Sequence, residues 1–106
     1  MSTENKESKR PTKPLGFVER AIAVTTSRRN RCPQFTIYEL VLAQLRYVKA
    51  VFDGSETDKS KLHRLSIGAI ASKEFQENDP ELARVLSDVF YLAIQSARGL
   101  KIQPPE

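Results

Sequence analysis

The segment Asn78-Asp79-Pro80-Glu81 and the apolar pattern after it constrain the fold of this chain more than any other feature. Asp79 can accept the free backbone N–H groups of a first helical turn, and Pro80 suits the first helical position because proline has no N–H to leave unbonded. Apolar residues then recur at three- and four-residue steps, which places them on one side of a helix. These residues are Leu82, Val85, Leu86, Val89, Phe90, Ala93 and Ala97. The sequence therefore predicts an amphipathic helix from Pro80 to about Arg98, whose apolar side must be covered.

Two helices are predicted in the first half of the chain. The first begins near Pro14 and ends in the polar run 27–31. The second starts at Thr36, which has the capping-box spacing to Glu39, and stops at Gly54, because glycine adopts the left-handed conformation at low cost. Its expected apolar side comprises Ile37, Leu40, Val41, Leu45, Val48, Val51 and Phe52. Gln44 lies within that side, and we interpret it as a buried, hydrogen-bonded amide in preference to a contact with a partner.

A third helix is predicted over residues 58–75, and it has two apolar sides when projected at 100° per residue. Leu62, Leu65, Ala69 and Ile70 lie on one side, whereas Ile67, Gly68, Ala71 and Phe75 lie on nearly the opposite side. We expect this helix to be packed between other helices, and the alternative is that its second side offers a shallow groove to a partner. A mid-helix glycine costs roughly 1 kcal/mol relative to alanine, so the close approach of another backbone would explain Gly68.

Together these patterns predict an all-α protein, an antiparallel bundle of about four helices joined by short loops. Its single helical domain is expected to span residues 14–102, between a disordered basic tail at residues 1–13 and a C-terminal tail at residues 103–106. Within residues 1–14, four basic and two acidic residues account for +2 of the net charge of +4. The folded part is therefore nearly neutral, which disfavours nucleic-acid binding.

The sequence contains no pattern typical of catalysis. We find no Gly-rich phosphate loop, no G-x-S-x-G motif and no Cys/His pair at metal-ligand spacing. His63 is the only histidine, and Cys32 is the only cysteine, which excludes an internal disulfide. No apolar run is long enough to span a bilayer. We accordingly expect no catalytic, cofactor-binding or metal-binding residue, no enzymatic activity, and a cytoplasmic protein without membrane association.

Charged residues are expected to gather at the two ends of such a bundle. The first helix ends, and the fourth begins, at the same end, which brings a basic run toward an acidic cluster. The basic run is Arg28, Arg29 and Arg31, and the acidic cluster is Glu74, Glu77, Asp79 and Glu81. A second acidic cluster, Asp53, Glu56 and Asp58, is expected at the other end. Mutual neutralisation of surface charge is the simplest interpretation of both clusters, and it stabilises little.

The second half of the chain resembles a known family. The order H-R-L-x-x-G-x-I-A-x-K-E-F-x-E-x-D-P-E-L, read from His63 to Leu82, is similar to that of small helical immunity proteins of the bacterial type VI secretion system. Further matching positions are Arg84, Leu86, Asp88, Tyr91 and the run 98–101. The resemblance covers residues 15–102. The polar residues 1–14 and the basic run after the first helix depart from the family pattern.

The resemblance implies a stoichiometric inhibitor that forms a heterodimer with a cognate effector toxin, in the family an NAD(P)+-glycohydrolase, and covers its active site or blocks its motion. A toxin cleft that binds a pyrophosphate is expected to be electropositive, so carboxylates of the inhibitor would be complementary. The predicted toxin-binding residues are Glu74, Glu77, Asp79 and Glu81, with Asp53, Glu56 and Asp58 as a second choice, and Tyr91 as an aromatic anchor. Two alternatives are a nucleic-acid-binding helical module that uses the basic run, and a purely structural adaptor or homodimeric bundle.

Overall fold

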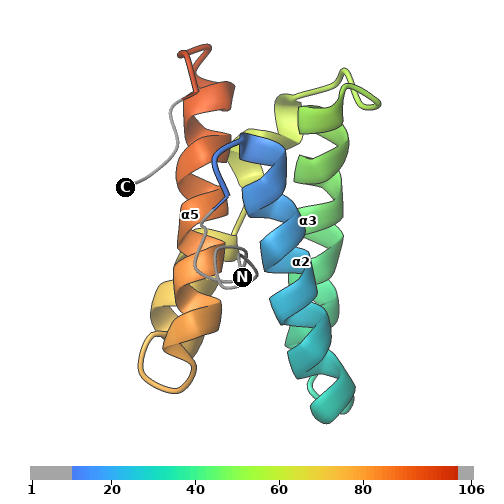
Figure 1. Cartoon of the computed structure of the whole chain (residues 1–106), viewed down its shortest axis with the longest axis vertical. Helices are drawn as coiled ribbons and strands as arrows, with labels where there is room; N and C mark the ends of the chain where they lie inside the picture. Colours follow the sequence, from blue (N-terminus) through green and yellow to red (C-terminus); the bar gives the residue numbers. More distant parts are fainter. Residues whose placement is uncertain (1–10, 103–106) are drawn as a thin grey trace, which may run out of the picture.

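Every regular element of the computed structural model, which describes residues 11–102, is helical (Figure 1). Four helical segments alternate in direction along the chain. They are α2 (Pro14–Arg31), α3 (Ile37–Asp53), a third segment made of η1 (Ser60–Arg64), α4 (Ile67–Ile70) and η2 (Ala71–Phe75), and α5 (Pro80–Ala97). The predicted all-α antiparallel bundle is confirmed. Most of the predicted tails, residues 1–10 and 103–106, lies outside the described residues, and residues 11–13 precede α2 without helical structure.

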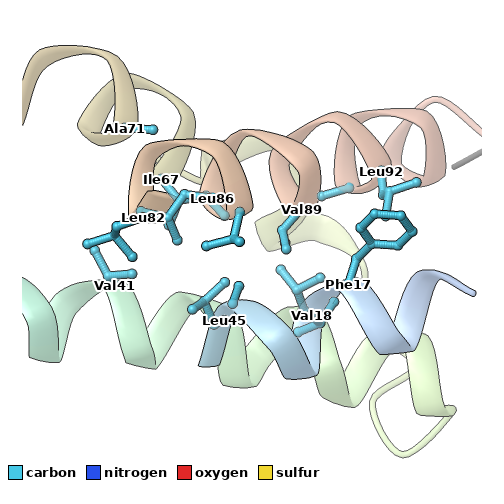
Figure 2. Packing of buried hydrophobic residues seen from close by; sticks show 14 of the residues in the cluster. Phe17, Val18, Val41, Leu45, Ile67, Ala71, Leu82, Leu86, Val89 and Leu92 are labelled. Atoms are coloured by element: carbon cyan, nitrogen blue, oxygen red, sulfur yellow. The ribbon is translucent and has the colours of Figure 1, made fainter. Parts of the chain in front are cut away.

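Helix α2 lies between α3 and α5 and packs against both, whereas the third segment packs against α5 (Figure 1). The apolar sides of these helices meet in one core. Figure 2 shows Val41 and Leu45 of α3 facing Leu82 and Leu86 of α5, and all four side chains are fully buried. Burial of each such side chain stabilises the fold by roughly 1.5–3 kcal/mol. The predicted apolar side of α5 is confirmed, because its members are buried or packed against this core.

The covered side of α3 differs from the prediction. Leu40, which was expected in the core, is 50% exposed, whereas Tyr38 and Leu42 are buried. Helix α2 packs on α3, and the Tyr38 ring stacks on Phe75 of the third segment. The buried side of α3 is therefore rotated toward Tyr38 and Leu42, away from Leu40.

The predicted capping box at the start of α3 is wrong. Thr36 adopts helical dihedral angles and its side chain makes no capping hydrogen bond. Its carbonyl oxygen accepts from the backbone N–H of Glu39 and of Leu40, at 3.0 and 3.3 Å. The Glu39 carboxylate lies 3.4 Å from the Arg29 guanidinium instead. The capping interaction is thus replaced by an ion pair with the C-terminal turn of α2.

The third segment is not the continuous helix predicted over residues 58–75. It is interrupted after η1, where Leu65 has extended dihedral angles. Gln44 of α3 stabilises this interruption from across the molecule, because its Oε1 accepts from the backbone N–H of Ser66 and of Ile67, at 2.8 and 3.2 Å. Its Nε2 also donates to Ser66 Oγ at 2.7 Å. The prediction that Gln44 is a hydrogen-bonded amide is confirmed, although the side chain is only partly buried.

The interruption removes the distinction between the two predicted apolar sides of the third segment. Leu62 and Ile67, which a continuous helix would place on opposite sides, are both fully buried. A Cβ atom built on Gly68 would lie 2.6 Å from Cδ2 of the Phe90 ring on α5. A side chain, and not a backbone as predicted, therefore requires glycine at this position. This surface is occupied by α5, and the shallow groove suggested there is absent.

Helix α5 begins as predicted. The Asp79 side chain accepts from the backbone N–H of Leu82 at 3.3 Å, and Pro80 occupies the first helical position. At the other end, Gly99 has a φ of 71°, and the backbone N–H of Leu100 donates to the carbonyl oxygen of Gln95 at 2.9 Å. Both ends of α5 are therefore satisfied by neighbouring residues along the chain.

Candidate functional site

The acidic cluster of Glu74, Glu77, Asp79 and Glu81, called the acidic corner below, lies where η2 leads into α5. Arg28, from the last turns of α2, contacts two of its members. Its Nε donates to Asp79 Oδ2 at 2.7 Å, and its Nη2 donates to Asp79 Oδ1 at 3.0 Å and to Glu81 Oε1 at 2.7 Å. The expected proximity of the basic run to the acidic cluster is thus confirmed for Arg28. One guanidinium joins the C-terminal end of α2 to the N-terminal end of α5.

The ion pair between Arg28 and Asp79 is partly shielded from water, with side-chain exposures of 15% and 20%. The hydrogen bonds from Arg28 hold the pKa of the Asp79 carboxyl below its ordinary value, although burial opposes this shift. The same contacts raise the pKa of Arg28. Asp79 also caps α5, so this carboxylate has a structural role in two elements at once.

Glu74 and Glu77 differ from the other two members of the acidic corner. Both side chains are exposed, and neither forms an ion pair with any residue between 11 and 102. The backbone around them is ordered, because Asn78 Nδ2 donates to the carbonyl oxygen of Glu74 at 3.2 Å. These two carboxylates are therefore available for contact with a partner on a defined segment of backbone.

A cleft of about 540 Å³ opens beside the acidic corner, between the link that precedes α3 and the link that precedes α5. Its lining residues are Gln34, Phe35, Thr36, Ile37, Tyr38, Glu74, Phe75, Asn78 and Asp79. The buried rings of Tyr38 and Phe75 stack within it, with centroids 5.8 Å apart and planes 6° from parallel. Burial also raises the pKa of the Tyr38 hydroxyl. The cleft therefore has an aromatic floor and carboxylates on one wall.

Two exposed apolar side chains lie near this cleft: Phe35, which no predicted apolar side included, and Leu40, which was predicted in the core. Phe35 lines the cleft and is 53% exposed, with its ring centroid 6.4 Å from that of Tyr38. Leu40 lies one helical turn after Thr36 and Ile37, which line the same cleft. A large aromatic residue in an otherwise polar link, outside every predicted apolar side, was the available signal for Phe35. Exposed aromatic residues of this kind often serve as binding anchors.

The second acidic cluster is arranged differently. Asp53 Oδ1 accepts from the backbone N–H and the hydroxyl of Ser55, and Asp58 Oδ1 accepts from the backbone N–H of Ser60. Hydrogen bonds from these serines lower the pKa of both carboxyl groups. Glu56 accepts from the backbone N–H of Asp58 in the same way. These carboxylates stabilise the link between α3 and η1.

Tyr91 is 49% exposed. It lies eleven residues after Pro80, which corresponds to a rise of about 16 Å along a helix. The structure therefore does not bring Tyr91 into the acidic corner, and a partner would have to cover much of α5 to contact both.

Within residues 11–102, no group of three or more His, Cys, Asp or Glu side chains is arranged to hold a metal ion. In the same part of the chain, no helix is both long enough and apolar enough to cross a bilayer. The lining of the cleft combines aromatic, amide and carboxylate groups.

Comparisons with known proteins agree with the resemblance carried by the sequence motifs. The family model of Tsi6 matches residues 13–95. The immune protein Tsi6 of Pseudomonas aeruginosa is 41% identical over 92 residues, which cover 87% of this chain and 98% of that protein. The solved structure of Tse6 in complex with Tsi6 matches with a TM-score of 0.83 over 87% of this chain and 98% of the matched chain. The structure of Tsi6 from Pseudomonas aeruginosa matches with a TM-score of 0.77 over 88% and 97%, again at 41% identity. The chain therefore belongs to the Tsi6 family of immunity proteins.

Proposed function

We propose that this chain binds a cognate effector toxin in the cytoplasm of the cell that makes it, and inhibits the toxin as a one-to-one complex without catalysing a reaction. The observation that carries the proposal is the 41% identity to the immune protein Tsi6 across 87% of the chain. The match to Tsi6 in its complex with Tse6 supports it, because the same helical scaffold is seen there with an effector. The motif resemblance extends the proposal to a toxin that uses NAD(P)+ or another nucleotide.

The acidic corner and its cleft are the proposed docking surface. Glu74 and Glu77 are exposed carboxylates without an internal ion pair among the described residues, and Phe35 adds an exposed aromatic ring beside them. A nucleotide-binding toxin must attract phosphate groups, so its entrance is expected to be electropositive and complementary to this corner. The complex would then either cover the substrate entrance or hold a moving part of the toxin in place.

The second acidic cluster and Tyr91 are weaker candidates for contact. Asp53, Glu56 and Asp58 accept hydrogen bonds from their own loop, so a partner would have to compete with these bonds. Tyr91 is a separate exposed position on α5 and stays a proposed anchor for an extended interface.

The charge pattern gives little support to the nucleic-acid alternative. Arg28 is paired with Asp79 and Glu81, and Arg29 lies 3.4 Å from the Glu39 carboxylate. Arginines already neutralised in this way release few counterions from a phosphate backbone. Arg28 and Arg29 are better explained as contacts that join the end of α2 to the beginnings of α5 and α3.

The test uses the cognate toxin domain, identified as the effector that co-purifies with this chain. Its affinity for the wild-type chain is measured by calorimetry, and protection is measured in cells that express the toxin. The Glu74→Lys/Glu77→Lys variant should bind at least roughly tenfold more weakly, because like charges would face each other across the interface. The matched control, Asp53→Lys/Glu56→Lys, makes the same charge change at the other end and should bind like wild type.

Asp79 and Glu81 are left unchanged in this comparison because they hold Arg28, so their reversal would also disturb the fold. Circular dichroism checks that both variants keep their helices. Unchanged affinity of the Glu74/Glu77 variant would remove the acidic corner as the docking surface. Failure of the wild-type chain to bind the toxin or protect the cells, or turnover of NAD+ by the purified chain, would refute the proposed function itself.

A further inference from the structure

We propose that the cleft beside the acidic corner receives an arginine side chain of the partner, which inserts between the Phe35 ring and the Glu74 carboxylate. This inference rests on the proposed function, because the arginine belongs to the bound toxin. It goes further by assigning one pocket and one side-chain chemistry as the anchor of the interface.

The first argument is charge. Two carboxylates, of Glu74 and Asp79, line the cleft, and no lysine or arginine does so among the residues that the structure describes. Both oxygens of Asp79 already accept hydrogen bonds from Arg28, whereas Glu74 has no ion-pair partner within residues 11–102. Arg28 itself is shared between two carboxylates, so the group of three carries a net negative charge. The charge of Arg31 also acts on Asp79, so Glu74 is the carboxylate of the cleft that is ready to accept the N–H groups of a cation.

The second argument is the chemistry of the surrounding rings. The stacked rings of Tyr38 and Phe75 provide an apolar floor, and the Phe35 ring is exposed at the rim. A guanidinium is planar and less strongly hydrated than an ammonium group, so it stacks on aromatic faces while it donates a forked pair of hydrogen bonds to a carboxylate. The aliphatic stem of arginine would contact this apolar floor at the same time. Arginine uses all three features of the cleft, whereas lysine offers a compact charge that remains strongly hydrated.

The third argument is the backbone that carries Glu74. Residues Ala71–Phe75 form a π-helix, η2, which is a wider turn than the α-helix and is frequently found at functional sites. Within it, Phe75 is buried against Tyr38 while Glu74 remains exposed at the edge of the cleft. Asn78 donates to the Glu74 carbonyl oxygen and fixes the turn that follows. The carboxylate is thus presented by a short, ordered segment, which lowers the entropy cost of binding.

The test compares two conservative variants with a matched control, each titrated with the cognate toxin domain. Glu74→Gln keeps the size of the side chain and removes its charge, and Phe35→Leu keeps an apolar group and removes the ring. Each should weaken binding by roughly 10- to 100-fold, the range for loss of a charged hydrogen bond or a binding anchor. Glu19→Gln is the control, because Glu19 lies on α2 outside the cleft and its exposed carboxylate faces Lys49 at 4.0 Å. It should change affinity by less than about threefold, as expected for an exposed charge.

The arginine itself is identified by substituting each surface arginine of the toxin domain with lysine. One of these variants should lose affinity for the wild-type chain and lose almost nothing further against Glu74→Gln, because the same contact is removed twice. If wild-type binding is intact but Glu74→Gln and Phe35→Leu bind like wild type, or if no toxin arginine couples to Glu74, the inference is wrong while the proposed function stands. If the wild-type chain does not bind the toxin at all, the proposed function fails first.

Discussion

Substitution of Asp79 tests the structural role assigned to the acidic corner, because this carboxylate caps α5 and also pairs with Arg28. Asp79→Ala removes the capping bond to the Leu82 N–H, which costs about 1 kcal/mol. It also removes two hydrogen bonds from Arg28, whose remaining partner is Glu81. Since the pair is partly exposed, we assign it about 1–2 kcal/mol, below the value for a buried ion pair. The free energy of unfolding should therefore fall by about 2–3 kcal/mol.

Asp79→Asn separates the two contributions. Asparagine caps helices about as well as aspartate, but it carries no charge for Arg28. This variant should lose only the ion-pair part, about 1–2 kcal/mol, and its α5 should remain intact. Urea unfolding followed by circular dichroism measures both variants, and the Tm of Asp79→Ala should fall by roughly 10 °C or more for a domain of this size.

A double-mutant cycle completes the test. In a chain that already carries Arg28→Gln, the change from aspartate to asparagine at position 79 should cost much less than in the wild type, because the partner is gone. The reasoning is refuted if Asp79→Asn is as destabilising as Asp79→Ala, since the cap would then contribute nothing. It is equally refuted if Asp79→Asn costs the same with and without Arg28.

Three further predictions follow from individual contacts. The folded-state pKa of Asp79 lies below its ordinary value of 3.8. The ionised carboxylate therefore stabilises the fold fully above about pH 5, and this contribution is lost as the pH falls through the folded pKa. Asp79→Asn should lose less stability than wild type between pH 5 and 3 in urea titrations. Gln44→Ala should cost about 1–2 kcal/mol and speed hydrogen exchange at the Ser66 amide, whereas unchanged exchange there would contradict the assigned bond. Gly68→Ala should destabilise the wild type, because its Cβ would meet the Phe90 ring at 2.6 Å, yet it should stabilise a Phe90→Ala chain by up to about 1 kcal/mol through helix propensity; destabilisation in both backgrounds would show that the ring is not the obstacle.

The features that the sequence determined by itself are local ones. Asp79, Pro80 and the Leu82 N–H are within four residues of one another, so the start of α5 depends on neighbours along the chain. The left-handed glycines at positions 54 and 99 are local in the same sense. The periodic apolar residues of α5 also identified its buried side, because a long amphipathic helix can satisfy that pattern in only one way. These signals were sufficient for the four helical segments and their alternating directions.

Other features depended on contacts between residues far apart in the sequence. Gln44, in another helix, accepts hydrogen bonds from the backbone N–H groups of Ser66 and Ile67. These bonds permit the interruption of the helix that was predicted over residues 58–75. Glu39 bonds to Arg29 and not to the helix start, because a guanidinium from α2 lies within reach. In both cases a tertiary partner competes with the local hydrogen bond that the sequence pattern indicated.

The candidate site depends partly on local sequence and partly on contacts between residues far apart in the chain. The acidic residues could be named from the sequence, but the sequence did not show which of them form ion pairs. Arg28 pairs with Asp79 and Glu81, while Glu74 is left without an ion pair in the described part of the chain. The cleft exists only because two links about 40 residues apart, one before α3 and one before α5, meet at the same end of the bundle. Local periodicity determines which side of each helix is buried, whereas the packing of helices decides which residues at their ends become neighbours.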